Sequence, residues 1–325
     1  MRKKGLIILA LIILILLPLV INNNYILHLV IYTCMYSVLG MSFNMMWKNR
    51  LITAGTAGFW AVGGYTSALL VTKLGIPFWL AMPAGGVASA LFALFIFSIA
   101  LRGGPLVFFS VSLVSAFIVM EVLGTVSFFG GWEGLLDVPG PKIGPYVFFT
   151  KTSFYYMVVA ILLLNIVTFH ALYTSRIGRA WTAIGSSTRL AEVQGVNIYR
   201  YRLAASVIGC FWAGIIGSFY AHYQNLLIPT TFSFLCSIYV QMYALIGGLN
   251  YFIAGPIVGS FVMVFLPELL RAGQEYQPIF FGVLLILIIV FLPGGLLSVG
   301  ERLPWLGRLF ERIGRRLRLV STKSY

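Results

Sequence analysis

The side chains that most often carry out chemistry are scarce in this 325-residue sequence. It contains three histidines, three cysteines and eight acidic residues. The histidines each lie near one end of a separate apolar run: His28, His170 and His222. The cysteines all lie within apolar runs: Cys34, Cys210 and Cys236. None of these residues has the spacing of metal ligands, so we expect no metal site and no disulfide framework.

Three common catalytic motifs are also absent from the sequence. There is no GxxxxGK[ST] phosphate loop, no HExxH zinc motif and no GxSxG nucleophile turn. We therefore predict no ATP site, no catalytic residue and no bound cofactor in this chain. An enzyme of the membrane would need such a constellation, so we do not expect the chain to be an enzyme.

Two acidic residues, Glu121 and Glu268, lie within or at the edge of apolar runs. An ionisable side chain inside a membrane is costly, and it usually faces a cavity or a partner. Both residues lie near the ends of their runs, so a structural role and a role in a transport pathway both remain open. Two acids do not make a proton relay, which argues against a proton-driven transporter.

The composition is that of a membrane protein. Hydrophobic residues make up 60% of the sequence and charged residues only 9%, with a mean hydropathy of +0.97. A soluble domain has about 25% charged residues. Because backbone in lipid must be hydrogen-bonded internally, we predict an all-α bundle of about ten transmembrane helices. The apolar runs are 5–21, 25–46, 55–72, 77–101, 105–124, 153–174, 203–222, 233–249, 252–270 and 278–297.

Two of these boundaries leave alternatives. The first run resembles a signal peptide, but Asn22, Asn23 and Asn24 follow it without a small-residue cleavage pattern, so we interpret it as an uncleaved span. At 245–256 almost no loop separates two runs, and a broken or re-entrant helix is an alternative there.

The basic residues predict the orientation. The sequence has 22 Lys and Arg residues against 8 Asp and Glu. With the N-terminus in the cytoplasm, 18 basic residues fall on the cytoplasmic side. Only four fall outside: Lys73, Lys142, Lys151 and Arg271. Cytoplasmic loops of membrane proteins are enriched in Lys and Arg, so we predict that both termini are cytoplasmic.

Three segments outside the runs stand out within this organisation. Residues 125–152 form a long external loop, and residues 176–202 form a basic internal loop. In the internal loop the sequence favours a short helix over Thr188–Val193, ended by Gly195. We thus predict that residues 1–297 form a transmembrane domain and that residues 298–325 form a basic amphipathic tail on the inner membrane surface.

The glycine-rich run 54–65 has weak helical propensity and polar neighbours. It either lines a path or forms a close-packed crossing, as small residues four apart do at Ala213/Gly217 and Gly255/Gly259. The residues that could line a path are Asn44, Thr53, Thr56, Tyr65 and Glu121.

Several stretches, taken in order, resemble permease subunits of branched-chain amino acid ABC importers, the LivM-like family. They are LGMSFNMMW (39–47), GGWEGLLDVPGP (130–141), RAWTAIGSSTRLAEVQGVN (179–197), AGIIGSFYAHY (213–223), GGLNYFIAGPIVGS (247–260) and LPELLR (266–271). The resemblance covers most of residues 30–297. It departs where the family carries glutamine and then Ser-Leu-Gly-His, because this sequence has Arg50, Thr53, Gly55 and Thr56.

The resemblance implies a transporter subunit without an ATP site, in the cytoplasmic (inner) membrane of a bacterium or archaeon. It would form a heterodimer with a second permease, two cytoplasmic ATPases would bind ATP and Mg, and a periplasmic or lipid-anchored binding protein would deliver substrate. The implied ATPase-coupling residues are Arg179, Ala191, Glu192, Gly195, Val196 and Asn197. The implied binding-protein-facing residues are Gly130, Gly131, Trp132, Glu133, Gly134 and Pro139.

Other readings of the sequence remain. The main alternative is a stand-alone secondary transporter or channel for a small polar solute, which usually carries charged residues deep in several spans. The sequence does not fix the substrate. Aliphatic amino acids come first, and other amino acids, urea and short amides are the alternatives.

Overall fold

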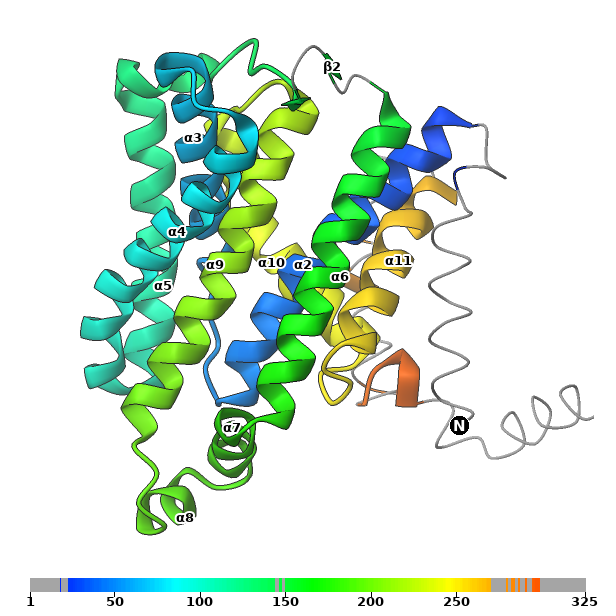
Figure 1. Cartoon of the computed structure of the whole chain (residues 1–325). Coiled ribbons are helices and arrows are strands. Elements are labelled where there is room, and N and C mark those ends of the chain that lie inside the picture. Colours follow the sequence, from blue (N-terminus) through cyan, green and yellow to red (C-terminus); the bar gives the residue numbers. More distant parts are fainter. Residues whose placement is uncertain are drawn as a thin grey trace, which may run out of the picture.

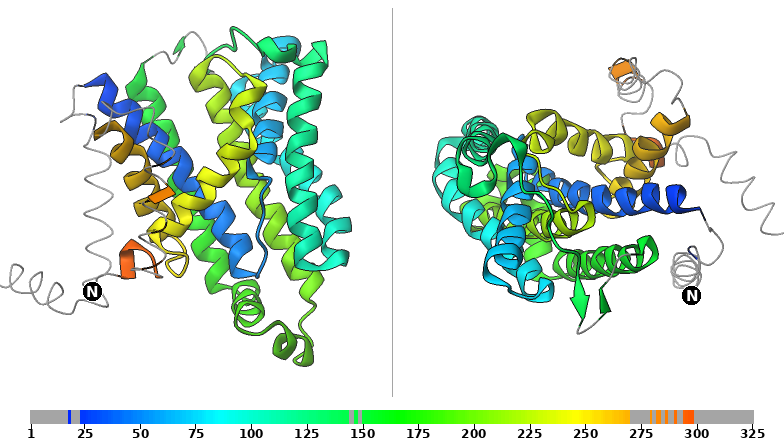
Figure 2. Two further views of the ribbon diagram at one scale, coloured as in Figure 1. Left: turned by 180° about the vertical axis from the view of Figure 1, so that it is seen from behind. Right: turned by 90° about the horizontal axis from the view of Figure 1, so that it is seen from above.

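The protein is a bundle of helices (Figures 1 and 2), seen in a computed structural model. The structure describes residues 18, 23–143, 146–147, 150–269, 279, 282–283, 286, 290 and 294–298. Its only strands within these ranges are β1 (Lys142–Ile143) and β2 (Tyr146–Val147), an antiparallel pair of two residues each. The all-α class predicted from composition is therefore confirmed.

Eight apolar runs are helical, as predicted. Their helices are α2 (Asn24–Lys48), α3 (Thr56–Leu74), α4 (Phe78–Ala100), α5 (Gly104–Thr125), α6 (Lys151–Thr174), α9 (Ile198–Gln224), α10 (Phe234–Gly247) and α11 (Ala254–Leu269). Four stretches of the described chain are long and apolar enough to cross a membrane: 24–48, 78–125, 151–174 and 198–224. The runs 5–21 and 278–297 and the tail 298–325 lie outside the described residues, apart from isolated positions. The number of ten spans stays a prediction.

The bundle has two ends that differ in charge. One end, the α8 end, carries η1 (Leu101–Gly103), α7 (Arg176–Ser186) and α8 (Thr188–Val193); the other, the β1 end, carries η2 (Ser127–Phe129), η3 (Gly131–Glu133) and the strands (Figure 1). Basic residues of the described chain gather at the α8 end: Lys48, Arg50, Arg102, Arg176, Arg179, Arg189, Arg200 and Arg202. Lys73, Lys142 and Lys151 lie at the β1 end. The predicted two-sided charge is thus present, while its direction across a membrane stays a prediction.

Helices α3, α4 and α9 pack with their backbones in contact. A methyl group added at Gly63 of α3 would lie 2.3 Å from Cα of Gly214 on α9. One added at Gly217 would lie 2.0 Å from the carbonyl oxygen of Trp60. Only glycine permits this approach. The C-terminal part of the 54–65 run therefore forms a close-packed crossing with the Ala213/Gly217 pair of α9.

Helices α10 and α11 form a second close pair, joined by a turn at 248–253. The carbonyl oxygen of Tyr243 on α10 lies 1.7 Å from where a methyl group at Gly259 would be. Gly248, at the C-cap of α10, has a φ of +117°, which favours glycine. The ambiguous boundary at 245–256 is therefore this tight turn, and the helices on both sides of it are continuous.

Two crossings contain non-helical backbone at other places. Residues 49–55 leave the end of α2 at the α8 end and run into the bundle before α3 begins (Figures 1 and 2). From the β1 end, residues 225–233, with η4 (Pro229–Phe232), run inward before α10 begins. The 14 residues of α10 extend only about 21 Å, against about 30 Å of hydrocarbon. Irregular backbone at such depth occurs only where protein or a water-filled cavity surrounds it.

Candidate functional sites

The short helix predicted in the internal loop is present with the predicted bounds. Ser187 caps α8 by accepting from the amide of Leu190 at 3.3 Å. At its other end Gly195 has a φ of +80°, and the amide of Val196 donates to the carbonyl of Ala191 at 3.0 Å. Asn197 then caps α9, which begins at Ile198 rather than near Leu203 because this cap starts the helix earlier.

Helix α7 precedes α8 and was not predicted from the sequence. Its apolar side chains recur at Ile177, Trp181 and Ile184, and this helical spacing is the signal that could have revealed it. Trp181 is buried, and its Nε1 donates to the carbonyl of Tyr201 on α9 at 2.9 Å. The loop is therefore a folded two-helix unit packed against the bundle.

Two arginines attach this unit to the start of the 49–55 segment. The Nε of Arg50 donates to the carbonyl of Gly185 on α7 at 2.8 Å. The Nε of Arg202 donates to the carbonyl of Asn49 at 3.0 Å, and its Nη2 donates to the hydroxyl of Thr188 on α8 at 3.5 Å. These contacts join residues far apart in the sequence, so spacing alone could not have indicated them. Arg202, which belongs to α9, thus contacts both α8 and the chain that leads to α3.

The outer face of α8 is exposed and partly apolar. Leu190 is 65% exposed and Val193 is 83% exposed, beside the charged Arg189 and Glu192. A hollow of about 550 Å³ adjoins the helix. Four predicted coupling residues line it: Glu192, Gly195, Val196 and Asn197. The other two do not. Ala191 lies on the buried side of α8, and Arg179 lies on α7, where its Nη1 donates to the carbonyl of Thr174 at 3.5 Å.

The predicted binding-protein-facing loop folds back on the β1 end of the bundle. Leu135 and Leu227 exchange backbone hydrogen bonds of 2.9 and 3.0 Å. This approach requires glycine at Gly134, where a methyl group would lie 2.0 Å from the carbonyl oxygen of Leu227. Trp132 and Glu133 remain exposed, whereas the carbonyl oxygen of Pro139 lies 2.7 Å from Nδ1 of His222. The six predicted residues thus share one surface loop.

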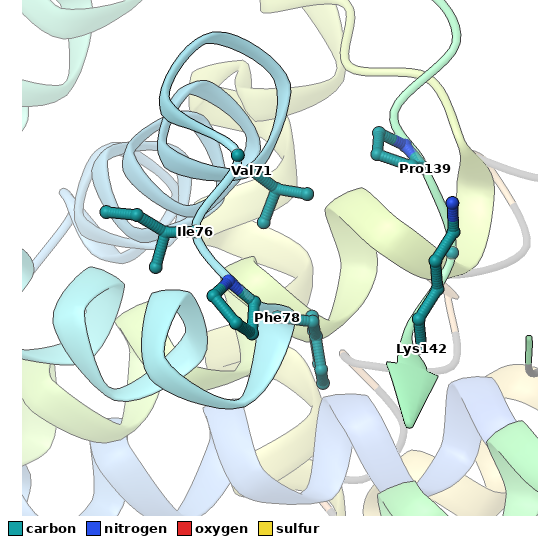
Figure 3. A pocket seen from close by; sticks show the side chains of 8 residues that line it. Val71, Ile76, Phe78, Pro139 and Lys142 are labelled. Atoms are coloured by element: carbon teal, nitrogen blue, oxygen red, sulfur yellow. The ribbon is translucent and has the colours of Figure 1, made fainter. Parts of the chain in front are cut away.

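Beside this loop lies a hollow of about 400 Å³ between the α3–α4 turn and residues 139–142 (Figure 3). Apolar side chains of Val71, Ile76 and Phe78 lie on one side, and Pro139 and Lys142 lie on the other. The hollow is a mostly apolar depression with one cation at its rim.

The five predicted pathway residues do not come together. Asn44 is buried against the turn after α10, where its Nδ2 donates to the carbonyl of Phe252 at 3.4 Å. The hydroxyl of Tyr65 donates to the carbonyl of Leu227, and Glu121 is exposed on α5, where it accepts from Thr125. Only Thr53 and Thr56 are neighbours, at the end of the 49–55 segment.

Around Thr53 and Thr56 the structure adds polar residues that sequence reasoning missed. The amide of Ala57 donates to the hydroxyl of Ser237 at 3.0 Å, and the Nε2 of Gln241 donates to the carbonyl of Thr53 at 3.1 Å. The amide of Ala54 donates to the hydroxyl of Ser112 on α5 at 3.0 Å. Ser237 and Gln241 lie four residues apart in an otherwise apolar run, and this polar pair was the available signal.

The helices and loops are those of a multi-pass membrane protein. The chain belongs to the family described as branched-chain amino acid transport system / permease component, whose model it matches over residues 25–291. It is therefore a membrane-spanning subunit of a transport system. No solved structure matches the chain.

Named relatives agree with this family. The chain is 27% identical to the high-affinity branched-chain amino acid transport system permease protein LivM of Salmonella typhimurium, over 82% of this chain and 68% of the relative. It is 24% identical to LivH of Escherichia coli, over 86% and 93%. It is 26% identical to the nucleoside ABC transporter permease protein NupC of Lactococcus lactis, over 54% and 59%.

Proposed function

We propose that this chain is a permease subunit of an ATP-driven ABC importer for branched-chain amino acids in a bacterial or archaeal cytoplasmic membrane. It spans the membrane about ten times with both termini in the cytoplasm, and it forms the translocation path with a second permease. The family match over residues 25–291 and the names of LivM and LivH support the substrate class. The gathering of basic residues at the α8 end supports its cytoplasmic location.

Two ATPase subunits dock at the α8 end in this proposal, and they hold the ATP and Mg while this chain holds no cofactor. The observation that carries the proposal is the structure of the α7–α8 unit. It presents exposed Leu190 and Val193, and Arg202 and Arg50 tie it to the chain leading into α3. A docked ATPase that moves α8 would therefore move the start of a helix inside the bundle.

The binding protein docks at the opposite end in this proposal. The exposed Trp132 and Glu133 and the hollow beside Lys142 support this assignment, because interface centres favour aromatic side chains and surrounding charges set the orientation of docking. The two functions are thus separated by the length of the bundle.

The test is purification of the tagged chain from its host in mild detergent, followed by reconstitution in liposomes. We expect a second permease and two ATPase copies per complex, and leucine uptake that needs both ATP and the binding protein. Repeated recovery of the chain alone in a folded state would contradict the proposal and favour a stand-alone transporter. Uptake of a nucleoside in place of leucine would contradict the substrate class.

A charge placed on α8 tests the docking surface. In the double variant Leu190→Asp/Val193→Asp we expect the ATPase to be lost from the purified complex, because two carboxylates oppose burial of this face. The matched control is Leu136→Asp, an equally exposed leucine at the β1 end, which retains the ATPase. Equal ATPase recovery in all three proteins would contradict docking at α8.

A further inference from the structure

The first turns of α3 carry two buried polar groups without a hydrogen-bond partner among the described residues. They are Oγ1 of Thr56 and Nε1 of Trp60. Thr56 is 3% exposed and Trp60 is 1% exposed. The two residues are four apart, so their side chains lie on the same face of the helix. Buried polar groups are nearly always hydrogen-bonded, so two unpartnered groups on one face call for a specific explanation.

This face points to the place where α10 begins. The ring centroid of Trp60 lies 4.9 Å from that of Phe232, which directly precedes the N-cap residue Ser233. It lies 4.9 Å from that of Tyr220 on α9 and 6.5 Å from that of Tyr36 on α2. Aromatic rings from α2, α9 and η4 therefore surround the ring of Trp60.

Two helix N-termini meet at the same place. Neither Gly55 before α3 nor Ser233 before α10 gives its helix a side-chain cap. Their first turns are in contact, because the amide of Ala57 donates to the hydroxyl of Ser237. The N-terminus of a helix carries partial positive charge and amide donors, and half-helices in transporters direct these ends at anionic substrate groups.

The unpartnered groups can supply the same kind of interaction. An indole Nε1 only donates, and a threonine hydroxyl can donate, so together with the helix ends they suit an acceptor such as a carboxylate. Around them the aromatic rings give an apolar wall, which continues from Tyr36 to Tyr243 on α10 at a centroid distance of 4.9 Å. An α-amino acid with an aliphatic side chain matches both features, because its carboxylate accepts hydrogen bonds and its side chain is apolar.

We propose that the junction of α3 and α10 binds the transported amino acid during its passage. Thr56 Oγ1 and Trp60 Nε1 donate to its carboxylate, and the rings of Tyr36, Tyr220, Phe232 and Tyr243 contact its side chain. This inference rests on the proposed function. It goes further by naming the carboxylate as the part of the substrate that this membrane subunit recognises. The permease then contributes selectivity after the binding protein has released its ligand.

The experiment uses the complete importer in liposomes with ATP enclosed and leucine-loaded binding protein outside. Two rates are measured: leucine uptake, and the ATPase rate stimulated by the loaded binding protein. We expect Thr56→Val and Trp60→Phe each to lower uptake roughly tenfold, the effect of losing one hydrogen bond to a charged group. The stimulated ATPase rate stays near that of the unmodified complex, because docking and coupling are intact.

Two further variants separate this role from a folding defect. Thr56→Ser keeps the hydroxyl and retains uptake. Thr66→Val removes a hydroxyl of the same helix that is already satisfied by the carbonyl of Val62 at 2.7 Å, and it also retains uptake. Unchanged uptake in the double variant Thr56→Val/Trp60→Phe would overturn the inference. It would also be overturned if Thr56→Ser lost as much uptake as Thr56→Val. If the unmodified complex transports no amino acid, the proposed function fails first and the inference with it.

A binding measurement tests the carboxylate directly. Saturation-transfer NMR on the solubilised complex, without the binding protein, uses leucine and leucinamide as probes at millimolar concentration. We expect transfer to leucine that is lost in Thr56→Val, and little transfer to leucinamide. Equal transfer to both probes would overturn the assignment of the carboxylate.

Discussion

Helix α3 passes through two regions that are built differently. Its middle, around Gly63 and Gly64, packs backbone to backbone against α9. Its beginning meets α10 through single hydrogen bonds between side chain and backbone. The amide of Ala57 donates to Ser237, and Gln241 donates to the carbonyl of Thr53 just before the helix. Close-packed backbones admit one arrangement, whereas a junction held by single hydrogen bonds can exchange partners at little cost. The comparison indicates a rigid unit of α3, α4 and α9 beside a junction that can rearrange.

The largest effect is expected from filling the rigid contact. Gly63→Val would place side-chain atoms inside the backbone of α9, so we expect a loss of about 3 kcal/mol of stability or more. Thermal unfolding in detergent, followed by size exclusion, measures it. The control Gly75→Ala has open space around it and a φ of +65°, so it costs only about 1 kcal/mol of backbone strain. Equal stability of the two variants would contradict a rigid unit.

A second prediction concerns Arg202, which connects α8 to the 49–55 segment that leads to the junction. Arg202→Gln removes the donors to Asn49 and Thr188, and we expect uptake to fall roughly tenfold because α8 no longer moves the 49–55 segment. The measurement is leucine uptake per folded complex in liposomes. Arg200→Gln, an exposed neighbour on α9, keeps normal uptake. An equal loss of uptake in both variants would contradict this prediction. It would mean that positive charge at the α8 end matters, and not the hydrogen bonds of Arg202 to Asn49 and Thr188.

A smaller effect is expected from one hydroxyl inside the rigid unit. Ser89 on α4 lies 2.9 Å from the carbonyl oxygen of Phe59 and 2.8 Å from that of Cys210. Both carbonyls also accept from the amides of their own helices, so Ser89→Ala removes only the additional bond between helices. We expect a loss of about 1 kcal/mol of stability, with uptake per folded molecule unchanged. In Ser98→Ala the lost hydroxyl bonds only within its own helix, so the melting temperature hardly moves. A drop in uptake without a drop in stability would place Ser89 in the pathway instead.

The smallest effect is expected at the edge of the junction. Gln241→Met keeps the side-chain length and removes the donor to the carbonyl of Thr53. We expect a change in uptake of about twofold and a stability change within about 0.5 kcal/mol, because the junction can find another partner. A loss as large as that of Gly63→Val would mean that the junction is as rigid as the glycine crossing.

Sequence reasoning predicted the elements whose signal is local. Apolar length gave eight of the helices. The helical propensity of Thr188–Val193 and the glycine at Gly195 gave the bounds of α8. Small residues four apart gave the close approach of Gly217 to α3. Each of these depends on neighbours in the chain, so propensity and spacing were sufficient.

Contacts between distant segments could not be predicted in the same way. Arg202 and Asn49 are 153 residues apart, and no pattern in either segment indicates the other. Thr56 was selected as a pathway candidate for its position in a glycine-rich run, and that role stays a prediction. Its neighbours Trp60 and Ser237 were not selected. Tryptophan in an apolar run ordinarily indicates packing. Only the three-dimensional arrangement shows that Nε1 of Trp60 has no partner within the part of the chain that the structure describes.

The non-helical segment 49–55 before α3 also bears on how the chain enters the membrane during synthesis. Because 49–55 is not helical, α3 has only 19 residues, four of them glycine or threonine in its first nine positions, and it is not among the stretches apolar enough to cross alone. The strongly apolar α4 follows after a three-residue turn. We expect α3 and α4 to insert together as a hairpin, with α3 held at the translocon until α4 has been made. Its glycine face stays uncovered until α9 emerges more than a hundred residues later.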